Sequence, residues 1–382
     1  MNKTLFTLAL ATGLGATAAM AQTVTELTTE AEINVVLGGS DDFRPSGSAV
    51  SAVGEVFFIN RGPANEVLMR YTPGSDTLEV IADADAMFAA IDAVNTDNGA
   101  TAFNPRQLEI AADGDLIVLG FASGATADAV VSVSNSTSPT ITVVYAPVGA
   151  ATDSVLDGSN GLTVLGNTAY VTVDQANGSE NAVFSIDTNT ALATPNKIVA
   201  GTDMATLFPA ITDTAGNLAI NDLTTDGTDL LGIVSNTADA PDAIVRITTA
   251  GVISEEVPAS EVIADLAAID ASVTDVGYGA ITLDGTGRVV LANGFGDGSF
   301  DEGFLFVDIS GATSSTTGLT GDELAALIGL TSPDLPLVRS DTISYDNTNM
   351  RLIFGHDATG FEGMYALESV NTADVEGWDL YN

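Results

Sequence analysis

The sequence predicts an all-β protein, a six-bladed β-propeller with short helices between its blades. Three observations favour this fold: a strand motif that recurs six times, a tight turn between two β-rich runs before each copy, and a further turn and strand after it. Four antiparallel strands of β-branched and aromatic residues are typical of a propeller blade. Because one blade cannot bury both of its faces alone, the six units are expected to stack into a closed ring.

The recurring motif consists of an acidic or amide residue, one small residue and a short apolar strand. Its six copies begin at Glu66, Asp128, Asn181, Asp242, Glu302 and Glu362. The intervals between these positions are 62, 53, 61, 60 and 60 residues. Chance would rarely produce this spacing, which indicates an internal structural repeat.

A tight turn upstream of each motif predicts that every unit begins with a hairpin. Residues 110–118 place Asp113-Gly114 between two β-rich runs. The corresponding turns centre on Gly54, Gly166, Asp226-Gly227, Asp284-Gly285 and Asp346-Asn347. Asp-Gly and Asn-Gly pairs are the residues that two-residue hairpin turns require. The motif is therefore expected to form the third strand of each unit.

Two further elements complete the units. A turn and a strand follow the motif, as in residues 77–81 and 251–254, and would be the fourth strand. In four units, apolar residues at helical spacing then predict short helices around 87–91, 204–208, 262–269 and 324–330. Thr320 and Glu323 match a capping box at the start of the last one.

The N-terminal residues predict export. Lys3, a short apolar run over 4–18 and Ala19-Met20-Ala21 form a secretory signal peptide pattern over residues 1–21. Residues 22–382 would then be one propeller domain, located in the periplasm or outside the cell. Residues 23–37 are expected to supply an outer strand that closes the last blade, the alternative being a frayed extension. No later run is apolar and long enough for membrane insertion.

The charge of the chain limits its partners. Acidic residues number 51 against 10 basic ones, for a net charge of -41, yet 46% of residues are hydrophobic, which favours a folded chain. Such a charge repels nucleic acid and anionic membrane surfaces. Two interpretations of the acidity stay open: hydrated carboxylates that keep the protein soluble in salty water, as on halophilic proteins, and a cation-binding surface.

The rare residue types limit the cofactors. Without cysteine the chain has no disulfide, thiolate metal site or covalent haem attachment. With one histidine and no cysteine, zinc is not expected, and no nucleotide site is expected either. Arg61, Arg106 and Arg339 fall near predicted loop ends, where they could pair with an anionic ligand or form salt bridges.

Oxygen donors near the first strands predict a cation site in the central channel. The loops between second and third strands share one face with the connections between blades, and this is the predicted functional face. The candidate metal ligands are Glu109, Asn160, Asn221, Asp222 and Asp341, which lie where first strands are expected to begin. Carboxylates and amides suit Ca²⁺ or Mg²⁺. Such residues also occur as ordinary turn residues, so both interpretations remain.

The same face predicts a site for an unidentified small molecule or an envelope or extracellular partner. Its candidate ligand-binding residues are His356, Asp357, Asn293 and Asp174. A triad hydrolase would need His356 as its base, and no G-x-S-x-G motif accompanies it. A surface residue in a loop is the alternative for His356. No catalytic residue is assigned.

The repeated hairpin, for example residues 281–291, resembles six-bladed propellers of the NHL and SMP-30/gluconolactonase type. The resemblance covers most of residues 22–382. It implies a divalent metal in the central channel on Glu, Asn and Asp side chains, and Glu109, Asn221 and Asp341 have matching types. The characteristic glutamate motif near the start is absent.

Two functions remain, because a fold does not determine a function. The first is an exported acidic propeller with a binding or structural role that includes Ca²⁺. The alternative is a metal-dependent hydrolase of the lactonase or esterase kind.

Overall fold

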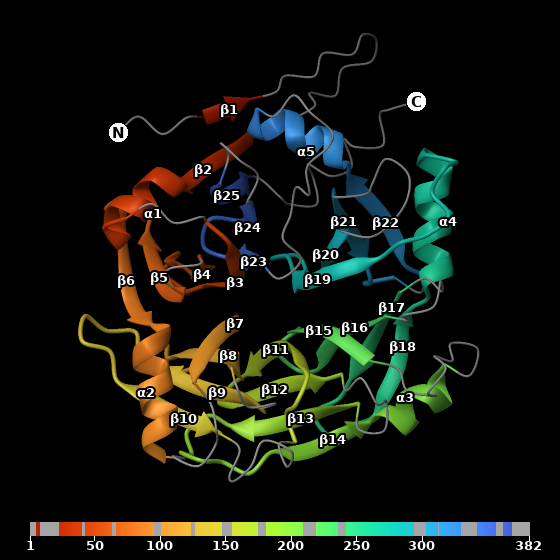
Figure 1. The fold of residues 1–382 in the computed structure, drawn as a ribbon. Coiled ribbons are helices and arrows are strands. Elements are labelled where there is room, and N and C mark those ends of the chain that lie inside the picture. The colour runs from red at the N-terminus through yellow and green to blue at the C-terminus, as the bar shows by residue number, and fades with distance from the viewer. Residues whose placement is uncertain are drawn as a thin grey trace.

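The computed structural model describes fourteen segments of the chain, and all structural statements below concern them. They are residues 5–7, 23–39, 43–62, 66–94, 101–123, 127–146, 155–174, 181–208, 219–235, 242–293, 303–311, 313–329, 342–356 and 362–368. Within them, six antiparallel sheets stand around a common centre, as Figure 1 shows. The predicted six-bladed propeller is confirmed.

Five blades are built from four consecutive strands each. The first contains β3 (Pro45–Val50), β4 (Val56–Arg61), β5 (Glu66–Thr72) and β6 (Thr77–Asp83). The second contains β7 (Ala102–Ile110), β8 (Leu116–Ser123), β9 (Ala127–Val133) and β10 (Ile141–Tyr145). The third contains β11 (Ser159–Leu165), β12 (Thr168–Val173), β13 (Ala182–Asp187) and β14 (Asn196–Ala200). The fourth contains β15 (Ala219–Thr225), β16 (Leu230–Ser235), β17 (Ala243–Ile247) and β18 (Ile253–Val257). The fifth contains β19 (Tyr278–Leu283), β20 (Val289–Asn293), β21 (Gly303–Asp308) and β22 (Ser315–Leu319).

The sixth blade joins the two ends of the described chain. It contains β23 (Ile343–Asp346), β24 (Arg351–His356), β25 (Gly363–Glu368) and β2 (Thr23–Thr29), with β1 (Leu5–Thr7) outside β2. Strand β2 pairs with β25 antiparallel, from Val24 opposite Leu367 to Thr29 opposite Gly363. This N-terminal strand therefore occupies the place of a fourth strand in the last blade.

The strand expected over residues 23–37 is too long, because its second half is helix α1 (Glu30–Leu37). A capping box starts this helix: the Glu32 N–H donates to Thr29 Oγ1 at 3.2 Å, and the Thr29 N–H donates to Glu32 Oε2 at 3.1 Å. Each group satisfies an amide that would otherwise lack a partner at the helix start. The reciprocal bonds end β2 at Thr29.

The four predicted inter-blade helices are present. They are α2 (Ala84–Val94), α3 (Gly201–Leu207), α4 (Ala259–Ile269) and α5 (Gly321–Ile328), and each follows the fourth strand of a blade. At the start of α5 the Glu323 N–H donates to Thr320 Oγ1 at 3.2 Å, so the predicted capping box is confirmed. None of the described helices is long and apolar enough to span a membrane.

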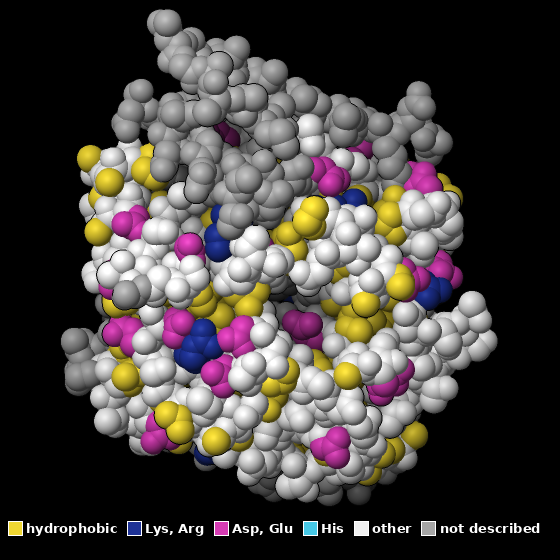
Figure 2. Space-filling view, turned by 180° about the vertical axis from the view of Figure 1, so that it is seen from behind, with side chains coloured by type: hydrophobic (Ala, Val, Ile, Leu, Met, Phe, Trp, Pro, Cys, Tyr) yellow, Lys and Arg dark blue, Asp and Glu magenta, His cyan; other side chains and the backbone are white. Residues whose placement is uncertain are grey.

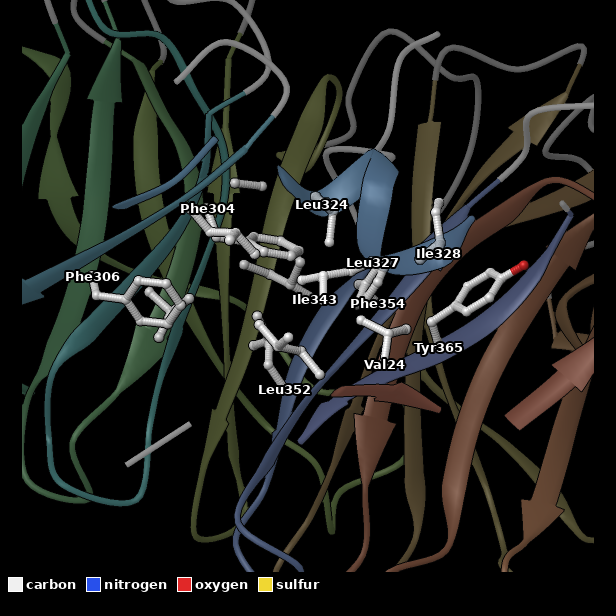
Figure 3. Packing of buried hydrophobic residues seen from close by; sticks show 14 of the residues in the cluster. Val24, Phe304, Phe306, Leu324, Leu327, Ile328, Ile343, Leu352, Phe354 and Tyr365 are labelled. Carbon is white, nitrogen blue, oxygen red and sulfur yellow. The ribbon is translucent and has the colours of Figure 1, made fainter. Parts of the chain in front are cut away.

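The core lies between neighbouring blades. Between the fifth and sixth blades, the rings of Phe304 and Phe354 meet edge to face with centroids 5.4 Å apart, and Tyr365 stacks on Phe354 at 5.7 Å. Leu324 and Ile328 of α5 belong to the same buried cluster, so this helix covers the boundary, as Figure 3 shows. Aromatic contacts of this kind add to the stabilisation from apolar burial.

The first strand of each blade faces the centre, and the six first strands contact one another around the whole ring. Five of them have a bulge or register shift against the second strand. The residues at these bulges are Gly47, Arg106, Asn160 with Gly161, Asn221 and Gly279. A bulge inserts a residue and redirects the neighbouring side chains.

Candidate functional site

A cavity of about 540 Å³ lies at the centre of the ring, where the first strands end and the tight hairpins begin. The residues that give it polar character include Glu109, Thr163, Thr225, Asp284, Ser344 and Tyr345. None of its described lining residues is Lys, Arg or His. Figure 2 shows a hollow near the centre of one face, with acidic side chains scattered around it. The cavity offers oxygen atoms from several blades to one ligand.

Glu109 is the titratable group of this cavity whose environment is most unusual. It is the second-to-last residue of β7 and is partly exposed. The pKa of Glu109 is raised from its ordinary value of 4.5 to about 8, mainly by burial and to a lesser extent by the negative charge of Asp222, while the hydrogen bond with the Ile110 backbone acts in the opposite direction. Near neutral pH this carboxyl group therefore holds a proton.

Asp222 of β15 is the carboxylate that acts on Glu109, and the backbone holds it in place. Its Oδ1 accepts a hydrogen bond from the Leu223 N–H at 2.9 Å, and its Oδ2 accepts one from the Ile281 N–H of the fifth blade at 3.1 Å. Strand β11 passes close by, because a Cβ atom on Gly161 would lie 2.7 Å from the Asp222 Cα. Asp222 thus joins the fourth and fifth blades, and its negative charge acts on Glu109.

The predicted cation ligands do not all occupy the same position along their first strands. The sequence predicted Glu109 at the beginning of a first strand, but it lies near the end. Strand β7 is nine residues long and starts at Ala102. Asn160 is exposed, and its carbonyl oxygen accepts a hydrogen bond from Gln107 Nε2 at 3.1 Å. Asn221 is partly buried. Asp341 lies outside the described residues.

The described residues contain no group of three or more His, Asp or Glu side chains placed to hold a metal ion. The pair that the structure does bring into electrostatic contact is Glu109 with Asp222. A channel cation stays a prediction.

The four predicted ligand-binding residues have different surroundings. His356 is the last residue of β24 and is fully buried, with Tyr365 edge-on at 6.3 Å, so the expectation of a surface loop residue is wrong. The strand continues to His356, which pairs with Gly363. Asp174 follows β12, partly buried, and its N–H donates to the Gly158 oxygen at 2.9 Å. Asn293 ends β20, and its side chain and Asp357 lie outside the described part.

The acidic residue of the sequence motif has a role that the sequence reasoning missed. Asp128 accepts hydrogen bonds from Ser159 at the start of the next blade, and Asp242 accepts one from the Tyr278 N–H at 2.8 Å in the same way. In these two blades the motif acid therefore joins neighbouring blades. The regular recurrence of an acid before the third strand was the signal.

Four arginines stabilise individual blades through ion pairs. The pairs are Arg70 with Glu79, Arg246 with Asp226 and Glu256, Arg288 with Asp284, and Arg351 with Asp346. The Asp284 and Asp346 side chains are fully buried, and their arginines approach to 2.7 Å and 2.9 Å. Buried charges need such partners. These four arginine side chains therefore stabilise the fold.

No protein-family model and no curated protein sequence matches the chain. Solved structures do match it. A protein of unknown function from Bacteroides thetaiotaomicron has a TM-score of 0.54 at 12% identity, over 91% of this chain and 76% of that one. An oligogalacturonate lyase in complex with manganese has a TM-score of 0.53 at 10% identity, over 97% of both chains. A candidate gluconolactonase has a TM-score of 0.50 at 10% identity, over 91% and 92%. The likeness is one of fold. The predicted resemblance to gluconolactonase-like propellers holds at that level.

Proposed function

We propose that this protein is an exported propeller that binds a divalent cation, Ca²⁺ or Mg²⁺, in its central channel. The observation that carries the proposal is the interaction of Glu109 with Asp222, two carboxyl groups from different blades whose mutual repulsion favours a proton on one of them. A cation would take the place of that proton and relieve the repulsion, as hard cations do among carboxylate oxygens.

Further oxygen donors line the cavity to which Glu109 belongs. Hydroxyl groups of Thr163, Thr225 and Ser344 line the cavity beside Glu109. Asn221 precedes Asp222 at a bulge of the same strand. Such neutral donors would complete the coordination without adding repulsion. The manganese complex of the oligogalacturonate lyase indicates that a propeller of this kind can bind a divalent ion.

Thermal unfolding of EDTA-treated protein tests this proposal. Submillimolar Ca²⁺ or Mg²⁺ should raise the Tm of the wild type, because a ligand that binds only the folded state stabilises it. The rise should disappear in Glu109→Gln and Asp222→Asn. Glu255→Gln removes one exposed carboxylate elsewhere and should respond as the wild type does. Equal rises in all four proteins would indicate general charge screening and contradict the proposal.

A metal-dependent hydrolase of the lactonase or esterase kind is the second candidate, and the elevated pKa of Glu109 favours it. A carboxyl group with a pKa of about 8 in a polar cavity is suited to general acid or base catalysis. If the protein is such an enzyme, kcat/KM for a lactone or an aryl ester should change around pH 8, and Glu109→Gln should abolish turnover. Turnover that is absent, or equal in the variant, would exclude this role for Glu109.

A further inference from the structure

Arg61 and Arg106 lie at the boundary between the first two blades, away from the four paired arginines. Arg61 is the last residue of β4, and Arg106 is the bulge residue of β7. Ser46 of the first blade donates a hydrogen bond to the Arg106 carbonyl oxygen at 2.6 Å, which fixes the bulge against its neighbour. Because a bulge redirects side chains, Arg106 differs in direction from the regular residues of its strand.

Both guanidinium groups act on one carboxyl group. Glu66 of β5 lies directly opposite Arg61 of β4 in the backbone register of the two strands. Burial raises the pKa of Glu66, and the positive charges of Arg61 and Arg106 only partly offset this. Strands β4 and β7, which carry the two arginines, are in contact with each other. Neither of them forms an ion pair with Glu66 or with any other described carboxylate.

The two arginines also retain buried donors. In the part of the chain that the structure describes, the Nε atoms of Arg61 and Arg106 are buried and have no hydrogen-bond acceptor. The Arg106 guanidinium lies over the ring of Phe121, 5.4 Å from its centroid, so the aromatic ring covers one face of the group. A buried donor without an acceptor is costly, so in native structures its acceptor is normally supplied by the protein, by an ordered water or by a ligand.

We propose that Arg61 and Arg106 bind a small organic carboxylate between the first and second blades. The planar donor edge of a guanidinium matches the two oxygens of a carboxylate. A singly charged ligand fits this place better than phosphate, because Glu66 and Asp128 both lie within electrostatic range of Arg106 and would repel a second negative charge. The site uses none of the residues proposed for the channel cation, so either proposal can fail alone.

Sodium acetate is the probe for this site, with sodium chloride at equal ionic strength as the reference. Saturation-transfer NMR on the acetate methyl protons measures binding directly, and a melting curve measures the stabilisation that binding gives. The variants are Arg61→Gln, Arg106→Gln and Arg106→Lys. Lys197→Gln serves as the matched control, because it removes one exposed cation in the third blade.

The wild type and Lys197→Gln should bind acetate equally, whereas Arg61→Gln and Arg106→Gln should bind it at least about tenfold more weakly. Arg106→Lys keeps the charge but lacks the planar fork and should also bind more weakly. This variant and Arg61→Gln carry the test if Arg106→Gln does not fold. Equal acetate binding by the wild type and the arginine variants, or no binding above chloride, would overturn the site. A stronger response to inorganic phosphate than to acetate would overturn the assignment to a carboxylate.

Discussion

Ser159 donates two hydrogen bonds to the same oxygen of Asp128, through its backbone N–H at 2.6 Å and through its Oγ at 2.7 Å. Asp128 precedes the third strand motif of the second blade, and Ser159 begins the first strand of the third blade. The interaction is buried on both sides. A residue that repeats along the sequence thus fastens one blade to the next.

Removal of the Asp128 side chain should destabilise the protein. In Asp128→Ala, two buried donors of Ser159 lose their acceptor, which costs about 1–3 kcal/mol per unsatisfied group. Asp128→Asn retains one acceptor oxygen and should lose less. Urea unfolding measures both, with the exposed hairpin variant Asp113→Asn as the control. Equal stability of Asp128→Ala and the control would contradict a fastening role.

The stability of the protein should depend on the protonation of Glu109. Its pKa is about 8 in the folded state, against an ordinary value of 4.5, so the folded chain binds more protons between these pH values. The stabilisation is therefore complete below about pH 4.5 and is lost as pH rises through about 8. Glu109→Gln cannot ionise and should remove this contribution.

Urea unfolding of wild type and Glu109→Gln at about pH 6 and about pH 9, without divalent cations, tests this dependence. The free energy of unfolding of Glu109→Gln relative to that of the wild type should be greater at the higher pH. Glu255→Gln corrects for the general effect of the net charge. A pH-independent difference would show that Glu109 is not buried enough to have a raised pKa.

Gly161 should be intolerant of a side chain. An added Cβ would lie 2.7 Å from the Asp222 Cα and 3.0 Å from Thr172 Oγ1, so Gly161→Ala must push β11 away from β15. Overpacking of this kind costs about 1–3 kcal/mol. Gly74→Ala has nothing within 4 Å and is the matched control, with a Tm close to that of the wild type. Equal Tm values in both variants would contradict the close approach of the first strands.

Phe354 should be among the most sensitive core positions. Its ring contacts Phe304 of the neighbouring blade and Tyr365 of its own blade, and it is fully buried. Phe354→Ala should lower the free energy of unfolding by about 3–5 kcal/mol, through lost burial and a cavity. The control Val53→Ala, at a residue that is 76% exposed, should change it little. A loss below about 1 kcal/mol would mean that the two blades can close the cavity.

The sequence by itself determined the blade. Local patterns predict it: the motif spacing, the turn pairs, and the helical spacing that follows the fourth strand in four blades. Such patterns reflect local hydrogen bonding and apolar periodicity. They identified the hairpins, the third strands and the capping box of Thr320 and Glu323. The same local rule was overlooked at Thr29 and Glu32, where it converts an expected strand into α1.

Only the tertiary structure decided which residues meet across blades. The sequence selected Glu109 and Asp222 by residue type, but their mutual effect depends on how β7 and β15 are arranged around the ring. The alternative that placed His356 in a surface loop is wrong, because pairing with β25 extends β24 as far as His356, which is buried. At the bulge of β7, the Arg106 carbonyl oxygen accepts a hydrogen bond from Ser46 of another blade. Contacts between residues far apart in the chain depend on ring closure, and no local pattern records it.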